Sequence, residues 1–304
     1  MDIQQSPLYK KYITALRWTV LCLDGTNIWI KKIPILGTLA KIQRPEILPY
    51  LPKLIPLLKR HHVRTVAAES SLNQSQEEFM TWINGLSKFF RISKETYLQT
   101  KTILIDLTKP EGEIFKAFTE AKQRAVRRAQ KHGVIIKESN NIRDLMYIKN
   151  ISAGMLGSMT TYGIDILWNI FYPKHATILL AYNPVIPHLP VIPAKAGILK
   201  MPDQVRHDNI IGGILLLFWE NIAYYWIAGA TKKGKKLFAP TLLVWEALKL
   251  SKKRRCKQFD FVGVLDERLP NKFKSWKGFT KFKEGFGGKK VYYPINYSYS
   301  KTSR

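Results

Sequence analysis

Four lysines surround one glycine in a short segment of this chain, and cations gathered at a turn can bind phosphate. They are Lys232, Lys233, Lys235 and Lys236. The segment lies between an expected strand, 222–230, and an expected helix, 238–251, so its backbone amides would meet an anion at a helix N-terminus. It contains only Gly234, and the glycine-rich pattern that holds the pyrophosphate of coenzyme A is missing. The sequence therefore predicts a phosphate-binding segment, with an exposed basic turn as the alternative.

A second basic cluster lies on a helix that we expect to end at Gly133. Its members are Arg124, Arg127, Arg128 and Lys131. Residues spaced three to four apart share one helix face. Such a face can contact the phosphates of a nucleic acid or can simply be solvated, and the spacing leaves both interpretations open.

The segment 278–288 combines aromatic, basic and glycine residues in the order Gly-Phe-Thr-Lys-Phe-Lys-Glu-Gly-Phe-Gly-Gly. Its later glycines would let a ligand or another backbone approach closely. They are Gly285, Gly287 and Gly288. Phe282 and Lys283 precede them, with Glu284 between Lys283 and Gly285. Taken alone, Lys283 is interpreted as a surface lysine on a short helix.

The elements that must position these residues alternate between helix and strand. Expected helices cover 7–17, 75–84, 109–132 and 238–251, and expected strands cover 18–23, 28–33, 63–69, 102–107, 134–137, 176–182, 210–219, 222–230 and 257–263. A tight Asp24-Gly25 turn should join the first two strands, and a capping box at Ser75 should open the second helix. Four prolines between 45 and 60 argue against a continuous helix there, because each proline removes a donor and clashes with the preceding turn.

The overall charge of the chain favours polyanionic partners. Its 304 residues include 49 lysines and arginines against 22 aspartates and glutamates, a formal net charge of +27. Such an excess attracts nucleic acid, an anionic membrane face or phosphorylated substrates, and the alternative is a protein that is merely basic. The hydrophobic fraction of 46% is enough for one large or two medium domains with packed cores.

Cysteine usage and apolar segments predict a cytoplasmic protein. Cys22 and Cys256 lie far apart and show no metal-ligand spacing. The N-terminus lacks the basic start and apolar core of a signal peptide. The apolar stretch 210–230 is divided by Glu220 and Asn221 into halves that are shorter than the roughly 20 residues of a spanning helix. We expect this stretch to form two buried strands joined by a tight turn.

The second half of the chain resembles the Fem-type aminoacyltransferases, the FemABX family. The family pattern Gly-Ala-Ser, a basic residue and Ala-Pro-x-Leu-Leu-x-Trp-Glu-Ala is similar to Gly-Ala-Thr at 229–231 and Ala-Pro-Thr-Leu-Leu-Val-Trp-Glu-Ala at 239–247. An apolar strand, the segment 278–288 and a tail with Val-Tyr-Tyr-Pro at 291–294 then follow in the family's order.

The resemblance implies a fold, an activity and partners. The family fold is α/β with mixed sheets, built from two tandem GNAT-like (acyl-CoA N-acyltransferase-like) domains. Family members move an amino acid from aminoacyl-tRNA to a side-chain amine of a peptidoglycan precursor, UDP-MurNAc-pentapeptide or lipid II, with no metal and no coenzyme A. We therefore expect an amide-forming aminoacyltransferase, monomeric and without a cofactor, that has a peripheral contact with the anionic inner face of the plasma membrane.

The resemblance also implies catalytic residues. In aminoacyl transfer an amine attacks an ester carbonyl, and a fixed cation can stabilise the oxyanion that develops. Lys283 matches the family lysine near the acceptor end of the tRNA, and Phe282 matches the aromatic residue beside it. The basic clusters at 232–236 and 124–128 would contact the tRNA.

Three further residues are expected to bind the precursor. Lys41 and Arg44 match a basic position that contacts its diphosphate, with an ordinary basic loop as the alternative. Asp106 matches a family aspartate at a strand end, where a turn or capping role is the simpler interpretation. Two departures, Tyr162 where some relatives have arginine and Thr241 where tyrosine is frequent, leave the choice of precursor open.

One segment, 183–208, does not follow the family pattern. It contains Val-Ile-Pro-Ala-Lys-Ala-Gly-Ile and resembles the translation of a mobile palindromic repeat found in bacterial genes. Its prolines argue against regular structure, and a long insertion at a hairpin tip costs little closure entropy. We expect a surface loop within the second domain, 141–288, whereas 1–140 and 289–304 form the first. A lid is the competing interpretation.

Two other functions fit part of the sequence. One is a GNAT-type enzyme with an acyl-CoA donor, which the missing pyrophosphate pattern disfavours. The other is a noncatalytic protein that binds nucleic acid or an anionic membrane, which the charge alone would explain.

Overall fold

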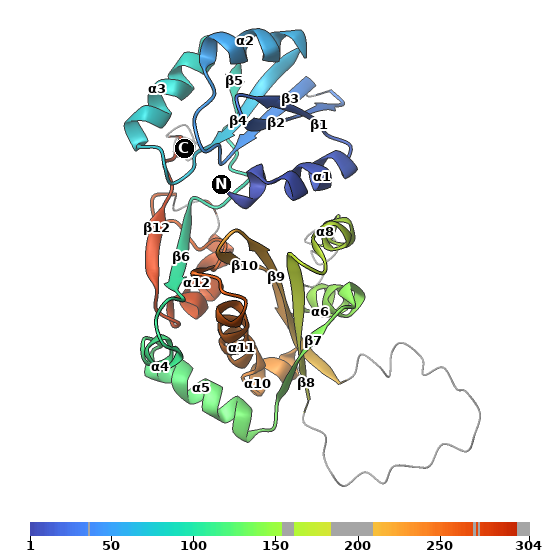
Figure 1. The fold of residues 1–304 in the computed structure, drawn as a ribbon, viewed down its shortest axis with the longest axis vertical. Coiled ribbons are helices and arrows are strands. Elements are labelled where there is room, and N and C mark those ends of the chain that lie inside the picture. The colour runs from blue at the N-terminus through green and yellow to red at the C-terminus, as the bar shows by residue number, and fades with distance from the viewer. Residues whose placement is uncertain (36, 154–160, 184–208, 270–271, 273, 297–304) are drawn as a thin grey trace, which may run out of the picture. The chain divides into compact units, whose positions relative to one another are not determined.

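The structure is a computed structural model that describes residues 1–35, 37–153, 161–183, 209–269, 272 and 274–296 (Figure 1). Its strands form two sheets, which confirms the predicted α/β class with mixed sheets. The contacts divide the chain into two units. Unit 1 comprises Met1–Leu104, Phe261–Glu284 and Gly288–Arg304, and unit 2 comprises Ile105–Asp260 and Gly285–Gly287.

The first sheet, in unit 1, starts from the predicted turn. Asp24 and Gly25 have φ angles of +47° and +81°, as a type I′ turn requires. The strands of this sheet are β1 (Thr19–Leu23), β2 (Thr26–Ile33), β3 (Gly37–Gln43), β4 (Val63–Glu69) and β5 (Arg91–Ile92), in the order β1-β2-β3-β4-β5. The first three pair antiparallel, and β3, β4 and β5 are parallel.

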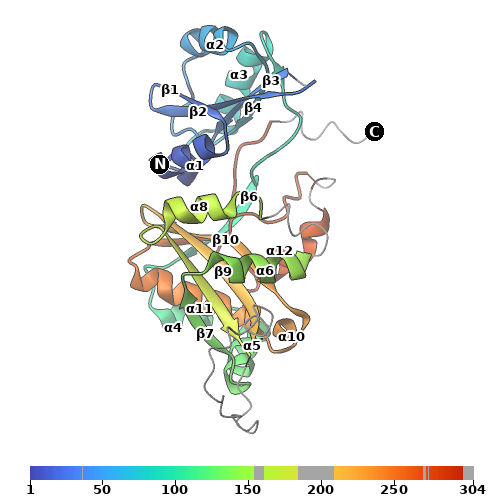
Figure 2. The ribbon, with the colours of Figure 1, turned by 90° about the vertical axis from the view of Figure 1, so that its right-hand side faces the viewer.

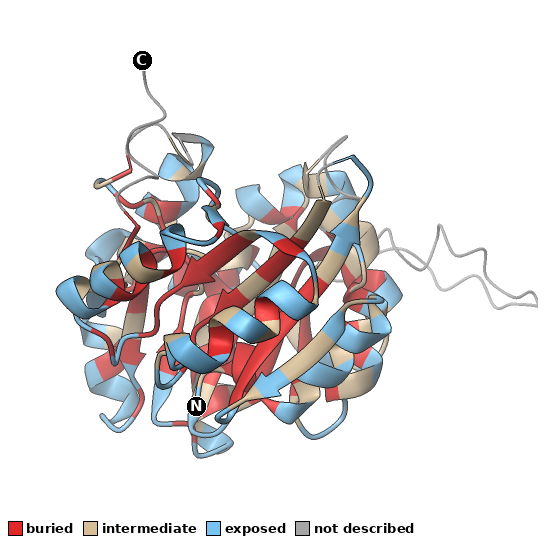
Figure 3. Cartoon of the chain, turned by 90° about the horizontal axis from the view of Figure 1, so that it is seen from above, coloured by how far each residue is buried: buried red, intermediate tan, exposed pale blue. Residues whose placement is uncertain are grey.

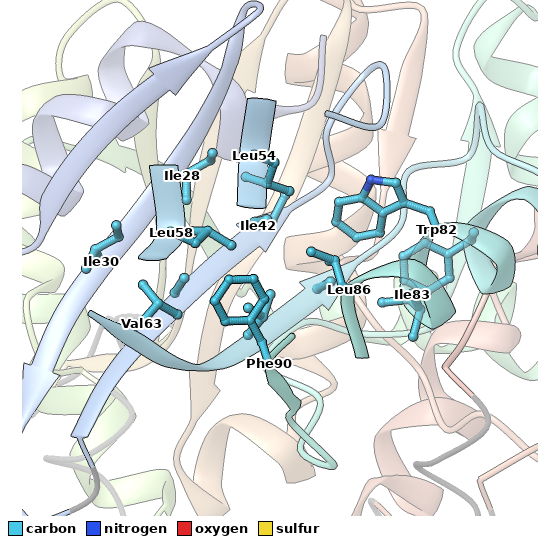
Figure 4. Packing of buried hydrophobic residues seen from close by; sticks show 14 residues of the cluster. Ile28, Ile30, Ile42, Leu54, Leu58, Val63, Trp82, Ile83, Leu86 and Phe90 are labelled. Atoms are coloured by element: carbon cyan, nitrogen blue, oxygen red, sulfur yellow. The ribbon is translucent and has the colours of Figure 1, made fainter. Parts of the chain in front are cut away.

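Helices cover both faces of this sheet. On one face α2 (Leu51–Arg60) and α3 (Gln76–Ser87) enclose a core in which Leu54, Leu58 and Leu86 are fully buried (Figure 4). On the other face η1 (Ile3–Gln5) and α1 (Pro7–Ala15) cover part of the surface. There Tyr9 stacks on Trp29 with ring centroids 5.3 Å apart.

Two local predictions in unit 1 have different outcomes. The capping box is confirmed, because Ser75 Oγ accepts a hydrogen bond from Glu78 N and Glu78 in turn caps Ser75 N. The prolines were expected to prevent a continuous helix over 45–60, and α2 nevertheless covers Leu51–Arg60. Pro52 lies in the first turn of α2, where no donor is needed, and Pro56 lies inside it. The burial of Leu54 and Leu58 outweighs the missing hydrogen bond of Pro56.

The strands of the second sheet fall in both units. In unit 2 the order is β11 (Gln258–Asp260), β10 (Ile222–Ala230), β9 (Ile210–Trp219), β8 (Ala176–Tyr182) and β7 (Ile135–Ser139). The predicted turn at Glu220 is confirmed, because β9 and β10 pair antiparallel from Trp219↔Ile222. In unit 1, β12 (Lys289–Tyr292) pairs antiparallel with β6 (Lys101–Asp106), whose last two residues belong to unit 2. Figure 3 shows buried residues along the strands.

The remaining helices include the carriers of the predicted basic clusters. In unit 2 they are α4 (Glu111–Lys116), α5 (Glu120–Lys131), α6 (Ile142–Ala153), α8 (Ile164–Phe171), α10 (Lys232–Lys236) and α11 (Ala239–Lys253); in unit 1 they are η3 (Lys274–Trp276) and α12 (Lys277–Glu284). Figures 1 and 2 show α6 and α8 on one face of the sheet of unit 2 and α11 on the other.

Three predicted elements differ from the structure. The helix expected over 109–132 begins at Glu111 and is divided into α4 and α5, because Phe118 turns inward and is 3% exposed. The basic segment expected as a loop is the short helix α10, capped by Thr231. The strand expected to reach residue 263 ends at Asp260, where the backbone enters a turn with Val262 at a φ of +51°.

The units also differ from the predicted domain bounds. Residues 105–140, expected in the first domain, belong to unit 2, because β7 pairs with β8 and α5 packs on α11. The predicted insertion lies outside the described residues apart from Asn183. Within the part of the chain that the structure describes, none of the helices combines the length and apolar character needed to cross a bilayer.

Replacing Pro56 by alanine should stabilise the fold. Alanine restores the hydrogen bond to the preceding turn of α2 and removes a ring clash, and these gains exceed the added flexibility of the unfolded chain. We expect the free energy of unfolding to rise by about 2 kcal/mol, measured by urea denaturation. Pro52→Ala is the matched control and should lower it by up to about 1 kcal/mol. A loss of stability in Pro56→Ala would contradict this account.

Candidate functional site

Lys283 is buried and holds a strained turn. It lies on α12 and is 7% exposed, so it is not the surface lysine of the simpler interpretation. Its Nζ donates to the carbonyl oxygens of Phe261 and Gly263, each at 2.7 Å. Between them Val262 has a φ of +51°, a genuine outlier for a β-branched residue. The ammonium group therefore fixes this turn and is itself held in one place.

Aromatic residues surround the same helix. The ring centroid of Phe279 lies 5.0 Å from Lys283 Nζ, and Phe279 also contacts Trp276. Phe282, predicted to act beside Lys283, is half-buried. A cation near an aromatic face is stabilised by the ring quadrupole, which adds to the effect of the two carbonyl oxygens.

A lysine that the sequence did not single out, Lys122, contacts Gly285 of the segment 278–288, and both residues belong to unit 2. The side chain of Lys122 on α5 lies against Gly285, where a Cβ atom would come within 2.8 Å of it. Its Nζ lies 5.0 Å from the ring centroid of Phe286. Burial lowers the pKa of Lys122 to about 8. The close approach expected at Gly285 is therefore made by a cation of the protein itself.

Thr119 joins the start of α5 to the same segment. Its backbone N–H donates to the carbonyl of Gly285 at 2.9 Å. Phe118, one residue earlier, contacts Phe286 and Trp245 edge-on, with centroid distances of 5.1 and 5.6 Å. Because the predicted long helix is divided at Phe118, the start of α5 lies against Gly285.

The four lysines of α10 are exposed around a buried glycine. Thr231 caps the short helix by accepting a hydrogen bond from Gly234 N at 3.0 Å. A Cβ atom on Gly234 would lie 2.0 Å from the carbonyl oxygen of Ile211. Close packing on β9 therefore requires glycine here, and it leaves the lysines on both sides exposed to solvent.

One arginine of α5 lies beside the residue that links α10 to α11 in unit 2. Arg124, Arg127 and Arg128 are all exposed, and Arg124 forms an ion pair with Glu120. The guanidinium of Arg128 lies 5.8 Å from the ring centroid of Phe238, the N-cap residue of α11, which follows the last lysine of α10 by two positions. Arg128 therefore lies close in space to the chain that follows the second basic cluster.

Lys41 lies in an aromatic cleft on unit 1. Its Nζ is 3.6 Å from the ring centroid of Tyr97 and 5.0 Å from that of Trp18. Burial lowers the pKa of Lys41 to about 8, although the nearby carboxylate of Glu69 opposes this. The ring of Tyr97 also lines a pocket of about 310 Å³, together with the charged side chains of Arg91, Lys94 and Glu95. A partly buried cation beside two rings suits an anionic ligand with an apolar part.

The other two predicted precursor contacts have internal partners. Arg44 is 2% exposed; it donates to the carbonyls of Ser70, at 2.6 Å, and Gln99, and it lies over the ring of Tyr293. Asp106 accepts hydrogen bonds from the hydroxyl and N–H of Thr108 at 2.6 and 2.9 Å, and these lower the pKa of its carboxyl. Asp106 thus makes the turn that the sequence gave as the alternative, and it belongs to unit 2 rather than unit 1.

A charged network that the sequence did not indicate fixes β12. Lys101 Nζ is 2.5 Å from the carboxylate of Glu267, which also accepts a hydrogen bond from Tyr292. Burial would raise the pKa of Glu267, but these two hydrogen bonds lower it to about 2. Arg268 bonds Asp266 and the carbonyl of Tyr293. Among the described residues, no group of three or more His, Cys, Asp or Glu side chains is arranged to hold a metal ion.

Comparison with known proteins gives a fold for the chain and a family similarity over its last third. Residues 197–295 match the model of the FemAB family, a range that includes α11, Phe282 and Lys283. No significant match was found among curated proteins. The crystal structure of FemX aligns with a TM-score of 0.69 at 13% identity, over 96% of this chain and 90% of that one.

Two further solved structures share the fold. The C-terminal domain (DUF2156) of a putative lysylphosphatidylglycerol synthetase from Agrobacterium fabrum has a TM-score of 0.56 at 12% identity, over 96% of this chain and 86% of that one. A tandem GNAT protein from the clavulanic acid biosynthesis pathway has a TM-score of 0.50 at 8% identity, over 88% and 77%. The chain thus has a tandem GNAT-like fold, as predicted. Over residues 197–295 it is similar to the FemAB family, in the part of the sequence that carries the predicted resemblance.

Adding one methyl group to Gly234 should disrupt α10. The new Cβ would overlap the Ile211 carbonyl, so α10 must shift, and we expect Gly234→Ala to lower the free energy of unfolding by about 3 kcal/mol. Gly112→Ala is the matched helical control, because nothing lies within 4 Å of its Cβ position. It should stabilise by about 0.5–1 kcal/mol. Equal melting temperatures for the two variants would show that the overlap is absent.

Proposed function

We propose that this protein transfers an amino acid from aminoacyl-tRNA to a side-chain amine of a peptidoglycan precursor, in the formation of interpeptide bridges. The observation that carries the proposal is the FemAB match over residues 197–295, which contain Lys283 and the family pattern of α11. The acceptor is UDP-MurNAc-pentapeptide or lipid II, and the lipid-linked form would be reached at the anionic inner face of the membrane.

The reaction needs positioning and charge stabilisation rather than a cofactor. The acceptor amine attacks the ester carbonyl of the aminoacyl-tRNA, an oxyanion develops, the C–N bond forms, and the C–O bond to the terminal ribose breaks. The ribose oxygen takes up the proton that the amine loses. A cation fixed before the reaction stabilises the oxyanion without reorganisation. We assign this role to Lys283, because two carbonyl oxygens hold its ammonium group in one position.

The basic clusters of unit 2 are assigned to the tRNA. The cations on α5 and α10 are exposed, and Arg128 of α5 lies beside Phe238, which follows α10 directly in the chain, so we treat the two clusters as one surface. Contacts of this kind bind phosphates without reading the sequence, which suits a protein that must accept a charged tRNA by its acceptor end. Lys122 extends this surface to the glycine segment at Gly285.

The cleft at Lys41 is assigned to the acceptor. Its ammonium group provides a charge for a diphosphate, and Trp18 and Tyr97 provide faces for apolar or ring-containing parts. Arg44 contributes by holding the loops at Ser70 and Gln99 in place, because its guanidinium is buried among them. Asp106 belongs to unit 2 and bonds Thr108, so its predicted acceptor contact is not part of this assignment.

Transfer of a labelled amino acid from a charged tRNA pool to each of the two precursors tests the proposal. We expect labelled precursor from the full-length protein, and Lys283→Ala should lower kcat on the order of 10²–10³-fold. Lys281→Ala, an exposed lysine on the same helix, is the matched control and should be unaffected. If Lys283→Ala does not fold, Lys283→Arg preserves a cation and should retain part of the activity.

The alternatives predict different results. Binding of coenzyme A with acetyl transfer and no tRNA-dependent product would favour a GNAT enzyme with an acyl-CoA donor. Intact tRNA binding without turnover on either precursor would favour a noncatalytic binder. Full activity in Lys283→Ala would remove this lysine from the mechanism while leaving the reaction class unchanged.

The low pKa of Lys41 predicts a pH dependence of acceptor binding. The ammonium form is present below about pH 8 and is lost as the pH rises through that value, so attraction for a diphosphate is lost on the alkaline side. At saturating tRNA, the KM for the acceptor should rise towards about tenfold per pH unit above 8. Lys41→Arg stays charged and should show a flat profile. A rising profile in Lys41→Arg would assign the effect to another group.

A further inference from the structure

Cations predominate at one end of unit 1, with Glu95, which lines a pocket together with Gly37 and Arg91, as a carboxylate at its border. The N-terminal ends of the parallel strands β3, β4 and β5 lie there, together with the C-terminal ends of α2 and α3 that lead into β4 and β5. Its exposed basic residues are Lys32, Lys59, Arg60, Arg64, Lys88 and Arg91. The three segments that build it, 26–45, 47–68 and 79–94, contain no aspartate or glutamate. We call this surface the basic end of unit 1.

Two large apolar side chains project from the basic end. Ile35, at the tip of the β2–β3 hairpin, is 103% exposed, and Phe89, after α3, is 51% exposed. Cations lie beside both. The side chain of Arg64 packs on the hairpin at Gly37, where a Cβ atom would lie 2.7 Å from it, and Lys59 Nζ lies 4.7 Å from the ring centroid of Phe89.

The helix dipole explains only some of the cations at the basic end of unit 1. Basic residues at the C-terminal ends of helices interact favourably with the helix dipole, which accounts for Lys59, Arg60 and Lys88. It does not account for the cations on the strands. Nor does it explain Ile35, a β-branched residue at a φ of +68°, where such a residue is strained and gains nothing from burial. Strain that the fold does not need points to a function.

We propose that the basic end of unit 1 docks on an anionic lipid bilayer, with Ile35 and Phe89 entering the headgroup region and the surrounding cations facing lipid phosphates. A bilayer offers both an apolar layer and a negative surface potential, so it matches both parts of the surface. A nucleic acid would match the cations but leave an exposed aliphatic tip without a partner. The proposal does not depend on the transfer reaction, because docking is measured without substrates.

Sedimentation of the full chain with vesicles tests the apolar part of the surface. The vesicles contain phosphatidylcholine with or without phosphatidylglycerol, and we expect binding only to the anionic ones. Ile35→Asn should weaken binding on the order of tenfold, and asparagine tolerates the left-handed backbone. Ile47→Asn is the matched control, because Ile47 is also exposed, at 77%, but follows the opposite end of β3. It should bind like the unchanged protein.

A second pair of variants separates a bilayer from a nucleic acid. Arg64→Gln with Arg91→Gln should weaken vesicle binding about fivefold for each cation and leave tRNA binding unchanged. Lys232→Gln with Lys233→Gln, in α10 of unit 2, should do the reverse. The proposal is overturned if Ile35→Asn binds vesicles as tightly as Ile47→Asn, or if the arginine pair loses tRNA affinity as much as vesicle affinity. It is also overturned if the unchanged protein does not bind anionic vesicles.

Discussion

The fold depends on how this chain satisfies buried cations with few carboxylates. Lysines and arginines exceed aspartates and glutamates by 27, so many cations find backbone carbonyl oxygens instead. Lys283 bonds two carbonyls of the turn at 261–263, Arg44 bonds those of Ser70 and Gln99, and Lys252 bonds those of Leu107 and Lys109 at 2.8 and 2.7 Å. Each set joins segments that regular secondary structure leaves apart, because hydrogen bonds to charged donors are stronger than neutral ones.

A cation that is bonded to backbone carbonyls can have a structural role and a chemical role at the same time. A lysine that fixes a strained turn has an ammonium group in a fixed position. A transition state that develops negative charge is stabilised by a cation that is already fixed in place. Lys283 therefore serves the fold whether or not it serves a reaction. The same reasoning separates Arg44 from Lys41. Arg44 is enclosed by its carbonyl partners, whereas Lys41 is only partly buried and lies beside the rings of Trp18 and Tyr97.

Local sequence signals predicted most of the elements but not the contacts between them. The Asp24-Gly25 turn, the capping box of Ser75 and the hairpin at Glu220 depend on neighbouring residues, and all are confirmed. Tertiary packing decided the rest: Leu54 and Leu58 support a helix that contains Pro56, and Phe118 divides a helix whose local pattern is continuous. The place of Lys122 against Gly285 had no signal in the sequence, since the two are 163 positions apart.

The interleaving of the two units affects how the chain can fold as it is synthesised. Unit 2 is one nearly continuous segment that closes with Gly285–Gly287, whereas unit 1 also needs Phe261–Glu284 and the segment from Gly288. The ribosome therefore delivers the first sheet early, but the residues that complete unit 1 emerge only after most of unit 2. Until then Lys101 lacks the carboxylate of Glu267, and Arg44 lacks the ring of Tyr293 although its carbonyl partners at Ser70 and Gln99 are already present. The growing chain therefore carries Lys101 without its ion pair while unit 2 is synthesised, and chaperones that recognise incomplete domains can act in this interval.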